Sequence, residues 1–315
     1  MAADANREGF RILRSESALL PMELLWRWSF GLGMLALAFF VYSQLRQAVL
    51  LSDTDELALN GQDPFAVAAA AENFLAVAMP PLLRVLEPVF CVAVVLWIAA
   101  TTVGRGIITR LMVRRFAADY TITIPTDAPR WSSFAILNFA RVLMLLILVI
   151  GYLGGTLLAG FVSTPEQNAL ASSLIVFASL AAAGLLWSYV NWVLSLAPIF
   201  VARDALPPLD SVAAAFTFLR RNYLRLSSIA LWNGTLRGVA ATVITLAGAF
   251  TVALRSALPS SAITALLILE TLLYLLISDL FLLARLGAYA SVAVRELTLS
   301  QSLPAPPDRS GTAIS

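Results

Sequence analysis

Residues 262–293 read AITALLILETLLYLLISDLFLLARLGAYASVA, and Glu270, Asp279 and Arg285 are their only charged residues. A helix needs about 20 consecutive, mostly apolar residues to cross the hydrocarbon core of a bilayer. We therefore interpret this run as a membrane span. Five further apolar stretches are long enough to be spans, and they cover residues 28–50, 82–103, 132–162, 169–201 and 227–254. The pattern predicts an all-α, polytopic membrane bundle of six transmembrane helices with cytoplasmic interfacial amphipathic helices.

The composition of the chain is that of a membrane protein. Apolar residues make up 60% and charged residues 13% of the 315 residues, whereas soluble domains contain roughly 45–50% and about 25%. A soluble fold of this length cannot bury so much apolar surface, but a membrane protein can leave it facing lipid.

The residue types that are missing exclude several kinds of chemistry. All 21 basic residues are arginine, and the chain has no histidine. A Ser-His-Asp triad, a histidine-ligated metal, a Schiff-base lysine and a P-loop are therefore excluded. Cys91 is the single cysteine and cannot form an internal disulfide or a thiolate cluster. We expect no catalytic residues, no metal and no cofactor, and the net charge of +2 gives no indication of nucleic-acid binding.

The arginines predict the orientation of the chain in the membrane. They cluster before span one, between spans two and three and between spans four and five, whereas loop 51–81 carries five acidic residues and no basic one. Cytoplasmic loops carry an excess of basic residues, so we expect both termini in the cytoplasm, with the spans in the inner (plasma) membrane of the cell. The predicted organisation is a cytoplasmic N-terminal segment 1–27, a membrane domain 28–299 and a disordered cytoplasmic tail 300–315.

Three segments are expected to lie on the membrane surface. Residues 64–79 are alanine-rich, 105–118 are basic and partly apolar, and 209–226 have an amphipathic pattern. In the last segment, Asp210 or Ser211 is expected to cap the helix. Its predicted apolar face consists of Val212, Phe216, Leu219, Tyr223 and Leu226.

The arginines of the basic segments are expected to face lipid headgroups. They are Arg114, Arg115, Arg220, Arg221 and Arg225. An ordinary connector that obeys the rule of positive cytoplasmic loops fits these segments equally well. Specific lipid recognition therefore stays one of two interpretations.

One stretch carries a resemblance to a known family. Residues 195–231, SLAPIFVARDALPPLDSVAAAFTFLRRNYLRLSSIAL, contain a small-apolar run, a charged turn with proline and an amphipathic helix that ends in an Arg/Asn/aromatic cluster. With the six-span layout, this stretch resembles the membrane domain that precedes the catalytic domain in some glycerophosphodiester phosphodiesterases, and its stand-alone six-span bacterial relatives, whose function is largely unknown. The resemblance implies a bacterial inner membrane. The phosphodiesterase activity of that family belongs to a separate metal-dependent barrel, and we do not expect it here.

Charged residues inside the spans are the first candidates for a functional site. A charge in the hydrocarbon core costs roughly 2.5–3.5 kcal/mol, so such groups pair or face a cavity. Arg237 and Asp279 lie at equal sequence distances from Leu258, in the turn between spans five and six. Equal distances give equal depth in an antiparallel hairpin, so we predict an Arg237–Asp279 ion pair. It is either a clamp between the two spans or part of a gate or polar site open to the cytoplasm.

Other polar residues within the spans are candidates for a polar site. They are Asn138, Arg141, Asn191, Asn233 and Glu270. These residues either line one hydrophilic pocket or join helices by hydrogen bonds, as polar residues in membrane bundles commonly do. Gly151, Gly155 and Ala159 are expected to form a packing ridge on span three.

Two hypotheses for function stay open. The first is a non-catalytic envelope protein that binds membrane lipids, anionic ones included, or a partner protein or a second copy of itself. The basic surface segments favour this hypothesis. The alternative is a transporter or permease with a polar site in the inner half of spans three to six. We expect no enzymatic activity, because the chain contains no recognisable catalytic set.

Overall fold

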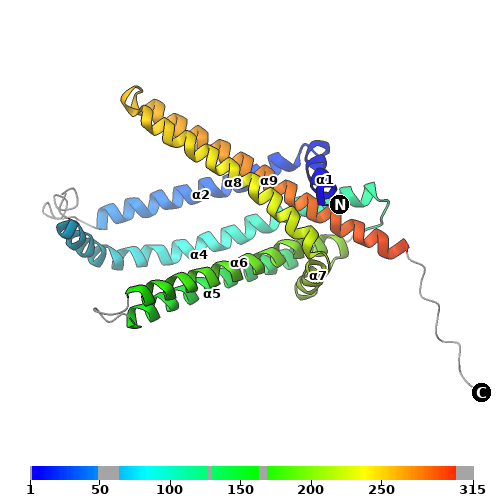
Figure 1. Cartoon of the computed structure of the whole chain (residues 1–315), viewed down its shortest axis with the longest axis horizontal. Coiled ribbons are helices and arrows are strands. Elements are labelled where there is room, and N and C mark those ends of the chain that lie inside the picture. Colours follow the sequence, from blue (N-terminus) through cyan, green and yellow to red (C-terminus); the bar gives the residue numbers. More distant parts are fainter. Residues whose placement is uncertain (1, 49–63, 126–129, 163–168, 303–315) are drawn as a thin grey trace, which may run out of the picture. The chain divides into compact units, whose positions relative to one another are not determined.

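A computed structural model of the chain describes residues 2–48, 64–125, 130–162 and 169–302 (Figure 1). The acidic part of loop 51–81 up to residue 63, and the predicted tail beyond Ser302, lie outside the described residues. Among these described residues, the regular elements are α-helices apart from one 3₁₀ turn at Leu254–Ser256. They are α1 (Ala2–Ser15), α2 (Leu19–Ala48), α4 (Pro64–Asp119), α5 (Trp131–Val162), α6 (Ala169–Asp204), α7 (Pro208–Arg221), α8 (Tyr223–Ala253) and α9 (Ser260–Ser302).

The predicted fold class is confirmed, and the chain is a multi-pass membrane protein. Within the described part of the chain, six helices are long and apolar enough to cross a membrane. Each matches one predicted span, and most extend further at one or both ends. The apolar segments are Leu19–Gln44, Met79–Asp119, Trp131–Phe161, Ser173–Asp204, Tyr223–Ser256 and Ser260–Leu299.

The helices divide into two compact units. One unit contains Met1–Leu24 and Thr102–Ser315, and the other contains Leu25–Thr101. The smaller unit consists of most of α2 and the first two thirds of α4, and Cys91 is exposed in it. The larger unit holds the candidate sites described below.

Two of the three predicted surface segments are parts of α4 instead. Residues 64–79 and 105–118 are continuous with span two in a single helix, Pro64–Asp119. Pro80, Pro81 and Pro88 lie inside this helix, because proline is tolerated in membrane helices, where neighbouring groups can satisfy the freed backbone. Gly104, the only residue between the predicted span and the basic segment, costs about 1 kcal/mol and does not end a helix.

The third surface segment is a separate helix, but with a different start and a different buried face. Helix α7 begins at Pro208 with no side-chain cap, and Ser211 Oγ donates to the carbonyl oxygen of Pro208 at 2.7 Å. Proline suits this position because the first N–H of a helix has no intrahelical partner. The helix ends before Asn222, and its buried residues are Ser211, Ala215, Phe218 and Leu219.

Of the five residues predicted for the apolar face, Leu219 is buried in α7 and Leu226 is buried at the start of α8. Phe216 is 46% exposed, whereas Phe218 packs edge-on against Phe200 of α6 at a ring distance of 5.4 Å. Tyr223 and Leu226 belong to α8, because the chain bends at Asn222. The buried face of α7 is the one that packs against α6. The helical spacing of apolar residues in this segment is compatible with either the predicted face or the buried one.

The core of the larger unit lies at the arginine-rich ends of its helices. Fully buried residues are concentrated near the end of α6 and along the last part of α9, as Leu196, Ile199, Leu283 and Ala290 illustrate. Most large apolar side chains at the opposite helix ends are exposed, and Phe161 on α5 is 87% exposed. Lipid covers such surfaces in a membrane protein, so the exposure agrees with six spans.

Helix α1 packs on α9 through two glycines. Ala5 and Ile12 are buried on the same face of α1 as Gly9. A Cβ atom at Gly9 would overlap the carbonyl oxygen of Ala284, and a Cβ atom at Gly287 would lie 3.2 Å from the Cα atom of Gly9. The two backbones therefore approach as closely as only glycine permits.

The predicted small-residue ridge on span three packs within the molecule. A Cβ atom at Gly155 would overlap the side chain of Ser179 on α6, and Ala159 is 3% exposed. Gly151, by contrast, has open space beside it. The ridge thus contributes to the α5–α6 contact at its second and third positions.

Candidate functional site

The arginines of helix α1 lie outside the face that packs on α9. Arg7, Arg11 and Arg14 are exposed at spacings of four and three residues, which place them on one side of a helix. Because Ala5, Gly9 and Ile12 occupy the other side, the helix is amphipathic and cannot rotate without burying arginine. The sequence prediction gave residues 1–27 only as a charged N-terminal segment and did not include this helix, although the apolar spacing at positions 5, 9 and 12 indicates it.

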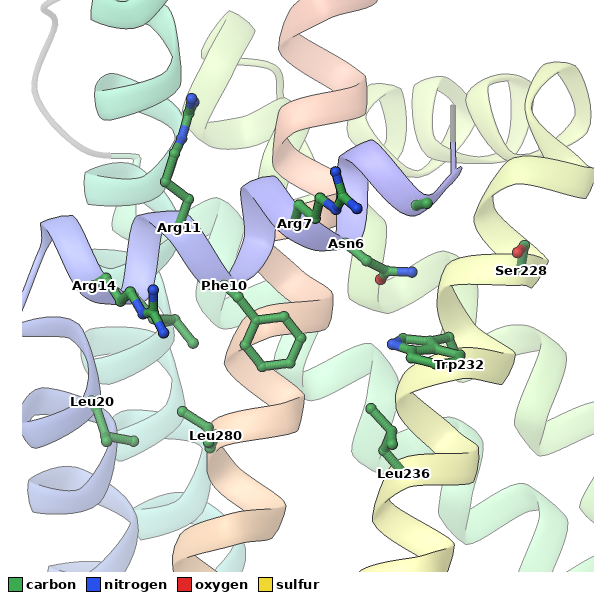
Figure 2. A pocket seen from close by; sticks show the side chains of 12 residues that line it. Asn6, Arg7, Phe10, Arg11, Arg14, Leu20, Ser228, Trp232, Leu236 and Leu280 are labelled. Carbon is green, nitrogen blue, oxygen red and sulfur yellow. The ribbon is translucent and has the colours of Figure 1, made fainter.

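A groove of about 980 Å³ lies between α1, the start of α2, α8 and α9. Figure 2 shows Arg7, Arg11 and Arg14 along α1, with Phe10 and Asn6 directed toward the space between α8 and α9. We call this site the α1 groove. Its remaining apolar lining includes Leu20, Trp232, Leu236 and Leu280. The groove therefore combines a cationic rim with an apolar floor.

The three arginines of the rim differ in their partners. Arg11 forms an ion pair with Asp119 of α4 at 3.3 Å and keeps 61% of its side chain exposed. Within the described part of the chain, Arg7 and Arg14 form no ion pair. Their guanidinium groups are therefore available to a ligand.

An ionic cluster fixes α1 to the end of α4. Arg115 lies 3.5 Å from Glu16 and 3.8 Å from Asp119, and the Tyr120 hydroxyl donates to Glu8 Oε1 at 3.2 Å. Burial and then the adjacent Glu8 carboxylate raise the pKa of Tyr120 above its usual value of 10.0. These contacts hold the rim of the α1 groove in place.

Three of the predicted polar residues form hydrogen bonds to three different helices. Asn138 donates to Thr102 Oγ1 at 3.2 Å, and Arg141 donates to the carbonyl oxygen of Leu194 at 2.9 Å. Asn233 donates to Asn6 Oδ1 at 3.0 Å, which ties α8 to α1. No hydrogen bond of the described residues joins two members of the predicted set, and these three contacts join helices.

Asn191 and Glu270 lie in two different cavities. Glu270 accepts a hydrogen bond from Thr251 Oγ1 at 2.7 Å, in a small cavity of the α8–α9 hairpin. Asn191 lines a cavity between α6, α8 and α9. The predicted set thus marks several polar positions along the bundle.

Arg237 and Asp279 have different surroundings. Arg237 is exposed on α8, whereas Asp279 is 4% exposed on α9 beside the equally buried Ser278. The ion pair between them stays a prediction.

A buried charged pair escaped the sequence prediction. Glu23 of α2 is fully buried, and its Oε1 atom lies 3.6 Å from Nη2 of Arg105 on α4. The pair was missed because span one was expected to begin at residue 28, whereas α2 begins at Leu19. A single acidic residue inside the apolar run LLPMELLW was the available signal.

The arginines predicted to face headgroups differ in their exposure and in their contacts. Arg114, Arg220 and Arg221 are exposed, whereas Arg115 belongs to the ionic cluster with Glu16 and Asp119. Arg225 is half-buried, and its Nε atom is buried without a hydrogen bond in the described structure. Contact with lipid headgroups stays a prediction for all five.

The chemistry of these sites is that of binding through charge and hydrogen bonds. The described residues include no group of three or more histidine, cysteine or acidic side chains that could hold a metal ion. No protein-family model, no curated protein and no solved structure matches the chain.

Proposed function

We propose that this protein is a non-catalytic lipid-binding protein of a bacterial inner membrane, and that anionic phospholipid occupies the α1 groove. The observation that carries the proposal is the arrangement of unpaired arginines above an apolar floor (Figure 2). Arginine suits a lipid phosphate because its planar guanidinium donates two parallel hydrogen bonds to phosphate oxygens.

The depth of the groove fits a phospholipid at the membrane surface. Its rim belongs to α1, which precedes the first apolar span at Leu19. Its floor consists of Trp232 and Leu236 in the fifth span and Leu280 in the sixth. A headgroup would therefore meet the arginines where its acyl chain enters the hydrocarbon, and tryptophan is common at that level.

The proposal includes the orientation of the chain, with both termini in the cytoplasm. The α1 groove lies at the arginine-rich ends of the spans, and the cytoplasmic leaflet is the one rich in anionic lipid. The resemblance of residues 195–231 to the membrane domain of glycerophosphodiester phosphodiesterases supports a bacterial membrane protein. We propose that relationship on the strength of those residues alone.

Lipid retention in purified protein tests the proposal. The full chain is extracted with its surrounding lipid, and the anionic phospholipid per protein is measured by mass spectrometry. The double variant R7Q/R14Q removes two charges from the rim, each worth about 1 kcal/mol toward an anionic surface. We expect its affinity for phosphatidylglycerol to fall roughly 30-fold.

The matched control is R130Q/R255Q, which removes the same charge from exposed positions outside the groove and outside the five arginines predicted to face headgroups. An equal loss in both double variants would mean that net charge attracts lipid and that the groove is not a site. Loss of a co-purifying protein from R7Q/R14Q, with lipid retention unchanged, would favour a protein partner and overturn the lipid proposal.

A further inference from the structure

A second cavity, of about 580 Å³, lies between α6, α8 and α9. Helix α6 contributes Asn191 and Trp192, α8 contributes Ser227, and α9 contributes Arg285 and Tyr289. We call it the α6–α8–α9 cavity. It is separate from the α1 groove, with which it shares only Ser228 among the lining residues.

Two hydrogen-bond donors in this cavity lack acceptors. Tyr289 is 2% exposed, and its hydroxyl is buried without a hydrogen-bond partner in the described structure. The Nε1 atom of Trp192 is also buried and has none. A buried donor without an acceptor costs about 1–3 kcal/mol. A ligand that supplies acceptors would recover that energy.

Arg285 gives the cavity a positive charge. Its side chain is half-buried, and it forms no ion pair within the described part of the chain. No carboxylate is among the described residues that line the cavity. An arginine within a membrane span is costly unless it pairs or faces water. The cavity therefore offers one cation and several donors to a negatively charged ligand.

The ring of Trp192 is held in position by a neighbour. Tyr223, at the start of α8, packs against it at a ring distance of 5.9 Å and an angle of 50°. The hydroxyl of Ser195, which also lines the cavity, already donates to the backbone oxygen of Asn191. Of these groups, the Tyr289 hydroxyl proton and the guanidinium group are free to bind a ligand, and the indole N–H lies beside the Tyr289 hydroxyl oxygen.

We propose that the α6–α8–α9 cavity binds a single oxyanion group, a phosphate or carboxylate. Arg285 supplies the charge, and Trp192 Nε1 and Tyr289 Oη donate the remaining hydrogen bonds. The group belongs either to a lipid headgroup or to a small soluble molecule such as inorganic phosphate. The proposal goes beyond lipid binding in the α1 groove, because the two cavities use different arginines.

Binding by the full chain, reconstituted in neutral phosphatidylcholine nanodiscs, tests the proposal. Inorganic phosphate is added in a calorimetric titration, and phosphatidic acid is added as the lipid probe and detected by native mass spectrometry. We expect saturable binding of at least one probe. R285Q should weaken it at least about tenfold, and Y289F should weaken it roughly three- to tenfold.

Three controls separate this proposal from alternatives. Arg237→Gln removes an exposed span arginine outside the cavity, and Y274F removes a hydroxyl from the Glu270 cavity. Both should bind as the unmodified protein does. R7Q/R14Q should leave binding of phosphate to this cavity unchanged, so failure here is distinguishable from failure of the α1 groove.

The outcomes decide both the site and its ligand. Phosphate binding that depends on Arg285 identifies a soluble oxyanion, and phosphatidic acid binding alone identifies a lipid headgroup. If R285Q does not fold, Y289F and W192F, which keep the ring packing, decide the question. Binding of neither probe, or equal binding by Y289F, W192F and the unmodified protein, overturns the proposal.

Discussion

Gly9 illustrates how a single residue sets the position of α1. A Cβ atom there would overlap the carbonyl oxygen of Ala284, because the α1 and α9 backbones are in contact. No periodicity argument distinguishes this glycine from Gly31 or Gly238, beside which a Cβ atom would meet nothing within 4 Å. The helical spacing of α1 was visible in the sequence, but the partner of its small-residue face was not.

Gly9→Ala is expected to destabilise the protein although alanine favours helices. The overlap with α9 should cost about 1–3 kcal/mol, more than the gain of up to about 1 kcal/mol from helix propensity. Gly238→Ala, at an open position on α8, should be neutral or stabilising. Thermal unfolding in detergent measures both variants, and an unfolding temperature for G9A equal to that of G238A would contradict the close approach of α1 and α9.

We expect the Tyr120 hydroxyl to make the free energy of unfolding decrease at alkaline pH. Burial, and then Glu8, raise the pKa of its hydroxyl in the folded state, so the folded protein holds this proton more tightly than the unfolded chain. The resulting stability is complete below the unfolded pKa of about 10, and it is lost as the pH rises through the folded pKa.

The variant Y120F isolates this contribution. Other tyrosines also titrate above pH 10, so the quantity to measure is the difference in unfolding free energy between Y120F and the unmodified protein from pH 8 to 12. The unmodified protein should lose more stability than Y120F as the pH rises. A difference that does not change over this range would show that Tyr120 is not buried beside Glu8.

At the scale of elements, apolar run length predicted all six spans, but not where each helix ends. The structure extends α2 back to Leu19 and α4 on to Asp119, because no residue there stops a helix. Length and hydropathy locate the part of a helix in lipid, whereas the ends are decided by packing among helices. For the same reason, the buried Glu23–Arg105 pair and the buried face of α7 were not predictable from spacing.

Arg203 connects the end of α6 to α9, and this contact between two helices can be tested by substitution. Its Nη1 atom donates to the carbonyl oxygen of Ala293 at 2.7 Å, and its guanidinium pairs with Asp204 at 2.7 Å. Lysine cannot form this fork of hydrogen bonds. R203K should therefore lower the free energy of unfolding by about 1.5–3 kcal/mol.

Arg220→Lys, at an exposed position on α7, is the matched control for R203K. It should change stability by less than about 0.5 kcal/mol, as surface substitutions usually do. Equal stability of the two variants in a denaturant titration would mean that the contact of Arg203 with α9 contributes nothing to the packing of α6.

At the scale of the whole molecule, buried contacts and arginines are concentrated at the same ends of the spans. The intramembrane polar residues could be located from the sequence, because charges in apolar runs stand out. Their partners could not, since hydrogen bonds such as Asn233 to Asn6 join residues far apart in the chain. The α6–α8–α9 cavity likewise depends on three helices whose mutual rotation no linear pattern encodes.

The arginines and the packed core lie at the same ends of the spans, and we expect these ends on the cytoplasmic side. Residues at the opposite ends should therefore be accessible to reagents added outside the cell. Cys91 is the single cysteine, so C91S provides a cysteine-free background for single reporters. Ser256, in the turn between α8 and α9, and Ala118, near the end of α4, are both exposed. With cytoplasmic termini, a membrane-impermeant maleimide should label S256C in intact spheroplasts and label A118C only after permeabilisation.

Labelling of A118C in intact spheroplasts, with S256C protected, would show that the chain has the opposite orientation. The arginine-rimmed α1 groove would then face the outer leaflet, and the anionic lipid proposed for it would have to come from there.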